Sequence, residues 1–101
     1  MRKIEKMMLE AIKAKKSVSL GNTAVEYRQA IETAIQSRIE TSRVYLHGNH
    51  IATVNYDRDL VVVNKDTLST YPTTTTKSRL RALGVDVCTR KGVVYLDGKP
   101  I

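Results

Sequence analysis

A chain of 101 residues has room for one domain, so we expect residues 1–101 to form a single unit. Hydrophobic residues make up 42% of it, which argues against disorder, and no apolar run approaches the roughly 18 residues of a transmembrane helix. The net charge is +7, and residues 1–20 and 71–101 each carry six basic and two acidic groups. Such a balance favours polyanions or acidic protein surfaces, with solubility alone as the alternative, and no membrane partner is expected.

The composition also limits the core and the redox chemistry. The chain has no Trp and no Phe, so Ile, Leu, Val, Met and Ala must fill the interior. Cys88 is the only cysteine, which excludes an intramolecular disulfide and suits a reducing compartment. It follows an apolar stretch, and we expect an inert thiol. Charged residues interrupt every apolar run after Arg2 and Lys3, so no targeting segment is expected.

Residues 3–16 are predicted to form an amphipathic helix. Apolar side chains recur there at the spacing of one helical face: Ile4, Met7, Met8, Ala11 and Ile12. This face belongs either to the protein's own core or to a surface for a partner, because methionine adapts to both.

The segment that follows is less regular. Residues 17–22 are expected to connect the helix to a strand at residues 23–27. The stretch 28–42 permits two interpretations. A short helix over 29–37 agrees with the spacing of Tyr27, Ile31, Ala34 and Ile35, and an extended arm is the alternative.

Residues 43–56 carry the strongest hairpin signal. A two-residue Gly48-Asn49 loop suits a type II′ turn, and it would place Leu46 opposite Ile51 and His47 opposite His50. After a turn, residues 60–64 are predicted to form a further strand, whose valine run suggests burial on both faces.

Residues 72–84 show helix start and stop signals. Thr73 or Thr74 can cap the N-terminus, and Gly84 fits the left-handed position after the C-terminus. Residues 85–89 should then pair with 93–96 across a turn. The predicted fold is α+β, with an N-terminal amphipathic helix, a small antiparallel or mixed sheet of hairpins, and one helix in the C-terminal half.

Signals for catalysis are missing from the sequence. It contains no Gly-x-Ser-x-Gly elbow and no glycine-rich phosphate loop. His47 and His50 lack the third and fourth ligands that zinc requires, so they are interpreted as exposed turn residues, with contact to a partner as the alternative. We therefore expect no metal, no cofactor and no enzymatic activity.

The helix over 72–84 is the best candidate for a binding site. Lys77 and Arg81 lie one turn apart, and Arg79 flanks the apolar side. The loop residues Arg90 and Lys91 could extend this patch toward phosphates, and Lys13, Lys15 and Lys16 could assist. An ordinary solvated helix face is the alternative.

Three blocks of the sequence resemble a known group of proteins. They are Gly21–Thr23, Tyr45–Ala52 with its Leu-His-Gly-Asn core, and Thr74–Leu83 with its Thr-rich run before Ser-Arg-Leu. They resemble recurring blocks of small accessory proteins in tailed bacteriophages, over about residues 21–98, although residues 28–42 depart from that pattern. The resemblance implies a phage protein in the cytoplasm of its bacterial host, binding nucleic acid or an acidic host protein that it inhibits or redirects. A homo-oligomer is a further alternative.

Overall fold

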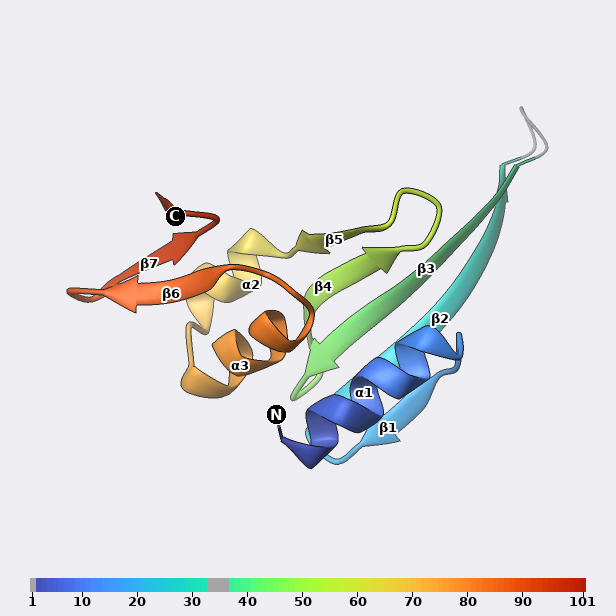
Figure 1. Cartoon of the computed structure of the whole chain (residues 1–101), viewed down its shortest axis with the longest axis horizontal. Coiled ribbons are helices and arrows are strands. Elements are labelled where there is room, and N and C mark those ends of the chain that lie inside the picture. Colours follow the sequence, from blue (N-terminus) through green and yellow to red (C-terminus); the bar gives the residue numbers. More distant parts are fainter. Residues whose placement is uncertain (1, 33–36) are drawn as a thin grey trace.

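The computed structural model describes residues 2–32 and 37–101, which form three helices and eight strands (Figure 1). In chain order these elements are α1 (Lys3–Lys13), β1 (Val18–Leu20), β2 (Thr23–Glu32), β3 (Ser37–Leu46), β4 (Asn49–Asn55), β5 (Leu60–Val63), α2 (Lys65–Thr70), α3 (Thr74–Ala82), β6 (Val87–Arg90), β7 (Val93–Leu96) and β8 (Lys99–Pro100). The predicted α+β class, with its N-terminal helix, is confirmed.

Strands β1 to β5 form one antiparallel sheet in sequence order. Its longest pair is β2–β3, which runs from Thr23 opposite Leu46 to Glu32 opposite Ser37. The described end of this ribbon continues past the neighbouring strands, because β1 pairs only as far as Val25 and β4 pairs only as far as Thr41. A second antiparallel sheet contains β6, β7 and β8.

The core lies between the helices and one face of the five-stranded sheet (Figure 1). Alternate residues of neighbouring strands, such as Val25 and Val44, turn toward the helices because strand side chains alternate between faces. As the composition predicted, the buried hydrophobic residues are aliphatic: Met8, Ala11, Ile12, Val25, Val44, Leu46, Ile51, Ala52, Leu68, Leu80, Val87 and Leu96. Residues from the second sheet belong to the same cluster.

The predicted boundaries of α3 are confirmed. Thr73 is its N-cap, and the Thr73 hydroxyl accepts a hydrogen bond from the backbone N–H of Thr76 at 3.1 Å. Gly84 follows the helix at φ +87°, a conformation that glycine adopts without strain. The predicted pairing of the next two strands is also confirmed, with Arg90 opposite Val93.

The helix predicted over 29–37 is wrong. The chain is a strand up to Glu32 and again from Ser37, so the extended alternative holds for the described part of this stretch. Ala34 and Ile35 lie outside the described residues. Cross-strand pairing with β3 satisfies the backbone there, and Ile31, expected on a buried helical face, is 71% exposed.

The predicted turn of the β3–β4 hairpin is shifted by one residue. The loop is His47–Gly48, with φ at +51° and +79°, so both central residues are left-handed as in a type I′ turn. Leu46 therefore lies opposite Asn49, and His50 lies opposite Tyr45 rather than His47. The register also shifts between Val44 and Tyr45.

Four further features differ from the prediction. Strand β1 occupies part of the expected connector, and α1 ends at Lys13, since Lys15 has a left-handed φ of 55°. Helix α2 was not predicted; it begins because the Asn64 side chain accepts a hydrogen bond from the Thr67 N–H. Strand β5 is an edge strand with Val62 55% exposed, so burial on both faces is wrong.

Candidate nucleic-acid interface

Helix α3 presents one arginine to the interior rather than to solvent. The side chain of Arg79 is only 3% exposed, and its Nη1 lies 2.7 Å from Oε2 of Glu5 on α1. Its Nε donates a hydrogen bond to the Thr23 hydroxyl at 3.0 Å, and Ser78 donates to the same carboxylate at 2.6 Å. This cluster joins α3, α1 and the start of β2.

The environment of Glu5 favours its charged form. Burial alone would raise the pKa of this carboxyl group, but the hydrogen bonds from Ser78 and Arg79 outweigh it, and the net pKa lies below the ordinary value. Arg79 is thus a buried partner of a carboxylate. The phosphate contact predicted for it does not fit this position, because its donors already face acceptors inside the protein.

The other two cations of α3 lie against strand β6. Lys77 Nζ donates a hydrogen bond to the Thr89 hydroxyl at 2.6 Å, and Arg81 Nε donates to the Val87 carbonyl oxygen at 2.9 Å. Because β6 is the outer strand of its sheet, this places both side chains along a sheet edge. Thr89 was not predicted as a site residue, although it belongs to the strand predicted over residues 85–89.

Arg90 and Lys91 follow at the end of the same strand, where the Arg90 side chain lies over the neighbouring strand β7. Arg90 ends β6, with its guanidinium carbon 5.7 Å from the centre of the Tyr95 ring, and Lys91 follows in the turn at φ +49°. We refer to Lys77, Arg81, Arg90 and Lys91 as the basic edge. From Val87 to Arg90 the strand rises about 10 Å, the length of roughly three base steps of a nucleic-acid strand.

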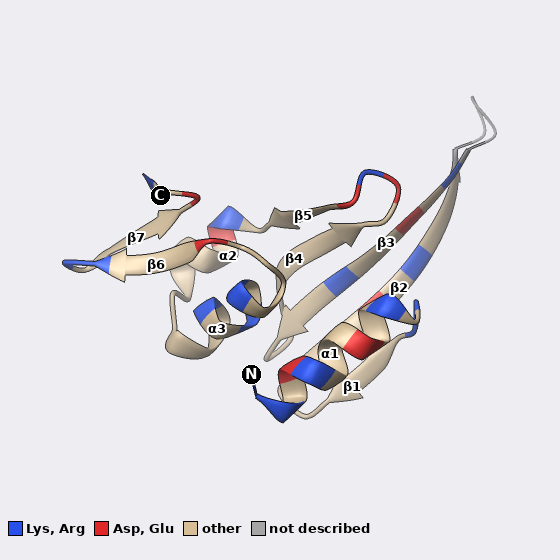
Figure 2. Ribbon diagram, viewed as in Figure 1, with Lys and Arg blue, Asp and Glu red and all other residues tan. Residues whose placement is uncertain are grey.

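Acidic residues are scarce along the basic edge. Between residues 73 and 93 the sequence has one carboxylate, Asp86, against five Lys and Arg. Figure 2 shows Lys and Arg on α3 and at the far end of the β6–β7 hairpin, and shows Asp at the β4–β5 turn, before β6 and at the β7–β8 turn. Basic residues therefore predominate on α3 and at the end of the hairpin, whereas the β4–β5 turn and α2 carry both signs of charge.

The lysines at the other end of α1 do not join this group. Lys13 closes α1, and Lys15 forms an ion pair with Glu40 and lies 5.2 Å from the centre of the Tyr56 ring. The hydrogen bond with Glu40 raises the pKa of Lys15, and the hydrogen bond with Lys15 lowers the pKa of Glu40. Glu5, which meets α3, sits instead in the first turn of α1.

The remaining candidate residues from the sequence are the methionines of α1, the histidines of the β3–β4 hairpin and the cysteine of β6. Met8 is fully buried and Met7 is 42% exposed, so α1 packs its apolar face mainly against its own sheet. His50 Nε2 is 2.7 Å from the Thr53 hydroxyl, and its ring packs beside Tyr45. Cys88 is half-buried in β6. Among residues 2–32 and 37–101, no three His, Cys, Asp or Glu side chains gather as a metal site would require.

The chain was compared with protein-family models, with curated proteins and with solved structures. No curated protein and no solved structure gave a significant match. Across the described residues, the helices are all too short or too polar to cross a membrane. A family model, described as Kyanoviridae Gp96 protein, matches residues 1–101. Because Kyanoviridae are cyanophages, the expectation of a bacteriophage protein is confirmed, and the chain belongs to the Kyanoviridae Gp96 protein family, a phage family of unknown function.

Proposed function

We propose that this phage protein is a non-catalytic accessory protein that binds nucleic acid in the cytoplasm of the host through the basic edge. The observation that carries the proposal is that α3 places Lys77 and Arg81 against β6, the strand that ends in Arg90 and Lys91. A row of cations with one neighbouring carboxylate attracts phosphates, and neutralising each phosphate releases counterions.

Phosphate contacts should dominate this binding. The basic edge has ammonium and guanidinium groups, and Tyr95 is already covered on one side by Arg90. Such groups hold the nucleic-acid backbone but carry no sequence information by themselves. We therefore expect binding that depends little on base sequence and strongly on salt.

The test is a titration of labelled duplex and single-stranded oligonucleotides, followed by fluorescence anisotropy at 50 and 200 mM salt. If all four cations contact phosphates, the affinity should fall by about 50- to 150-fold between these concentrations. Replacing one of them, as in Arg81→Gln, should weaken binding at low salt and reduce the salt slope by about one.

A variant with all four replaced, using Lys91→Asn to suit the left-handed backbone of the turn, should lose nearly all binding. The matched control is Lys13→Gln with Lys16→Gln, at and just after the C-terminal end of α1, compared with Lys77→Gln with Arg81→Gln, because each pair removes two charges. Equal losses in the control would mean that net charge alone drives binding, and the basic edge would then have no special role.

Failure to bind any oligonucleotide at low salt would reject the proposal. The same cations recognise carboxylates, so an acidic host protein would then be the alternative partner. It would be sought by a pull-down from nuclease-treated host lysate, with the four-fold variant as the control. Light scattering would show whether a homo-oligomer forms.

A further inference from the structure

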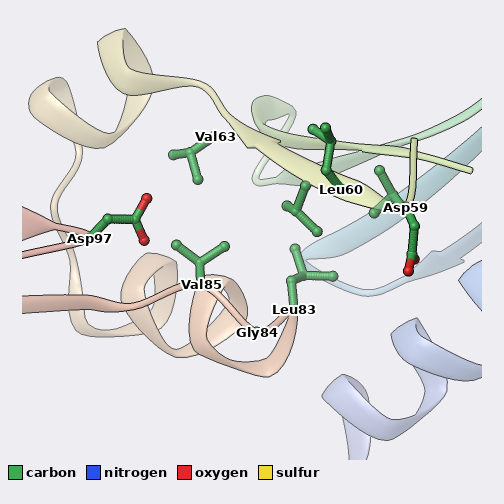
Figure 3. A pocket seen from close by; sticks show the side chains of 9 residues that line it. Asp59, Leu60, Val63, Leu83, Gly84, Val85 and Asp97 are labelled. Atoms are coloured by element: carbon green, nitrogen blue, oxygen red, sulfur yellow. The ribbon is translucent and has the colours of Figure 1, made fainter.

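A pocket of about 380 Å³ lies where the five-stranded sheet meets the connection from α3 to β6 (Figure 3). Six of its nine lining residues are aliphatic and come from both sides, with polar surface between them: Val54, Leu60, Val61 and Val63 from the sheet, and Leu83 and Val85 from the connection. The volume is near the lower end of the range for ligand pockets, which suits one side chain or a small molecule.

Two carboxylates mark the ends of this pocket. Asp97 comes from the β7–β8 turn, and Figure 3 shows its carboxylate directed toward Val63 and Val85; Asp59, from the β4–β5 turn, stands at the opposite end. In the described part of the chain, neither carboxylate has an ion-pair partner, and the lining includes no Lys, Arg or His. This is a local excess of negative charge on a protein of net charge +7.

A mixed lining of aliphatic side chains and polar groups, with a carboxylate at the end, matches one kind of ligand. A lysine side chain has a four-carbon stem that covers apolar surface and an ammonium that pairs with a carboxylate. Arginine suits the site less well, because its planar guanidinium gains from stacking on aromatic rings and the lining contains none.

We propose that this pocket receives the side chain of a lysine presented by a partner protein, with the stem against the aliphatic walls and the ammonium at Asp97. The pocket shares no residue with the basic edge, so it is a second and separate binding site. A protein that carries both could hold nucleic acid on one side and a basic protein segment on the other.

The probe is lysine blocked as its Nα-acetyl N-methylamide, titrated into the ¹⁵N-labelled protein. Saturable shifts are expected at the amides of Val63, Gly84, Val85 and Asp97. The form acetylated on Nζ keeps the stem but loses the charge, so it should produce no saturable shift. Raising the salt concentration should weaken binding of the charged probe, because the pocket is open to solvent.

Substitution of the carboxylates should identify the contact. Asp97→Asn should lower the affinity about fivefold. Asparagine tolerates the left-handed backbone that Asp97 and Asp59 adopt, with φ of 52° and 50°, so the turns should survive. Asp66→Asn on α2 is the control, since it removes the same charge outside the pocket.

Three results would overturn the proposal. The first is the absence of saturable shifts at the pocket amides, and the second is an equal effect of Asp97→Asn and Asp66→Asn on the affinity. The third is equal binding of the blocked lysine with a free Nζ and of the form acetylated on Nζ. A fourth arm uses 1,5-diaminopentane. If this free diamine binds and the blocked lysine does not, the site takes a small amine and the assignment to a protein partner is wrong.

Discussion

The ion pair between Arg79 and Glu5 joins residues that are 74 positions apart in the chain. Both side chains are almost completely removed from solvent. Burying two charges is costly, and the attraction offsets that cost only when hydrogen bonds satisfy the remaining polar atoms. Here Thr23 and Ser78 supply such bonds, so the cluster tolerates a charged pair in the interior.

Replacing Glu5 with glutamine should therefore destabilise the protein by about 3 kcal/mol at pH 7, because Arg79 would stay buried without a counter-charge. The pKa of Glu5 is lowered in the folded state. Its contribution to the free energy of unfolding is therefore present at pH values above the ordinary pKa of a carboxyl group, and it is lost as the pH falls through the pKa of the folded state. The difference between wild type and Glu5→Gln should shrink on acidification. Denaturant unfolding at pH 7 and at pH 3 measures both values.

Two further variants make this interpretation falsifiable. Glu10→Gln, on the exposed side of α1, should change stability little. The double variant Glu5→Leu with Arg79→Met should be more stable than Glu5→Gln, since it removes both charges together. A constant difference across the pH range would show that Glu5 contributes by packing and not by its charge.

The sequence could not identify which arginine of α3 is buried. With only Leu80 and Leu83 as large apolar residues near the end of this helix, the apolar side is narrow, and Arg79 borders it. Its burial depends on Glu5, which reaches it only through tertiary packing. Helix spacing alone placed Lys77 and Arg81 one turn apart, whereas their position beside β6 comes from the packing of α3 on this strand.

At the scale of elements, the clearest local signals predicted the structure best. The cap at Thr73, the glycine after α3 and the β6–β7 hairpin all depend on neighbouring residues. The β2–β3 ribbon depends instead on pairing between distant segments. Its apolar spacing also suits a helix, and strand preference is decided mainly by such tertiary context.

The cap itself can be tested. Thr73→Ala should lower the free energy of unfolding by about 1 kcal/mol, since the N–H of Thr76 would lose its acceptor. Thr74→Ala is the matched control, because Thr74 is exposed in the first turn and alanine favours helix. Thermal and urea unfolding of both variants give the comparison. Equal losses would mean that the Thr73 hydroxyl is not the cap that α3 uses.

At the scale of the whole molecule, the two sheets share one core. Val44 and Ile51 of the first sheet and Val87 and Leu96 of the second belong to the same buried cluster, and α3 lies between them with Leu80 fully buried. The basic edge and the aspartate-lined pocket are thereby fixed relative to each other, since the α3–β6 connection that lines the pocket joins the two elements of the basic edge (Figure 3). Both proposed sites depend on this shared packing.

Truncating the residue at this junction should show whether the sheets unfold together. Leu80→Ala should cost about 2–5 kcal/mol, because a fully buried leucine leaves a cavity when it is shortened. If the core is continuous, hydrogen exchange at the amides of Val44 and Val87 should accelerate by the same factor. Val62→Ala, at an exposed position, should accelerate neither amide appreciably. If Val87 exchanged through a separate opening that left Val44 protected, the second sheet would be an independent unit, and the expectation of one domain over residues 1–101 would be wrong.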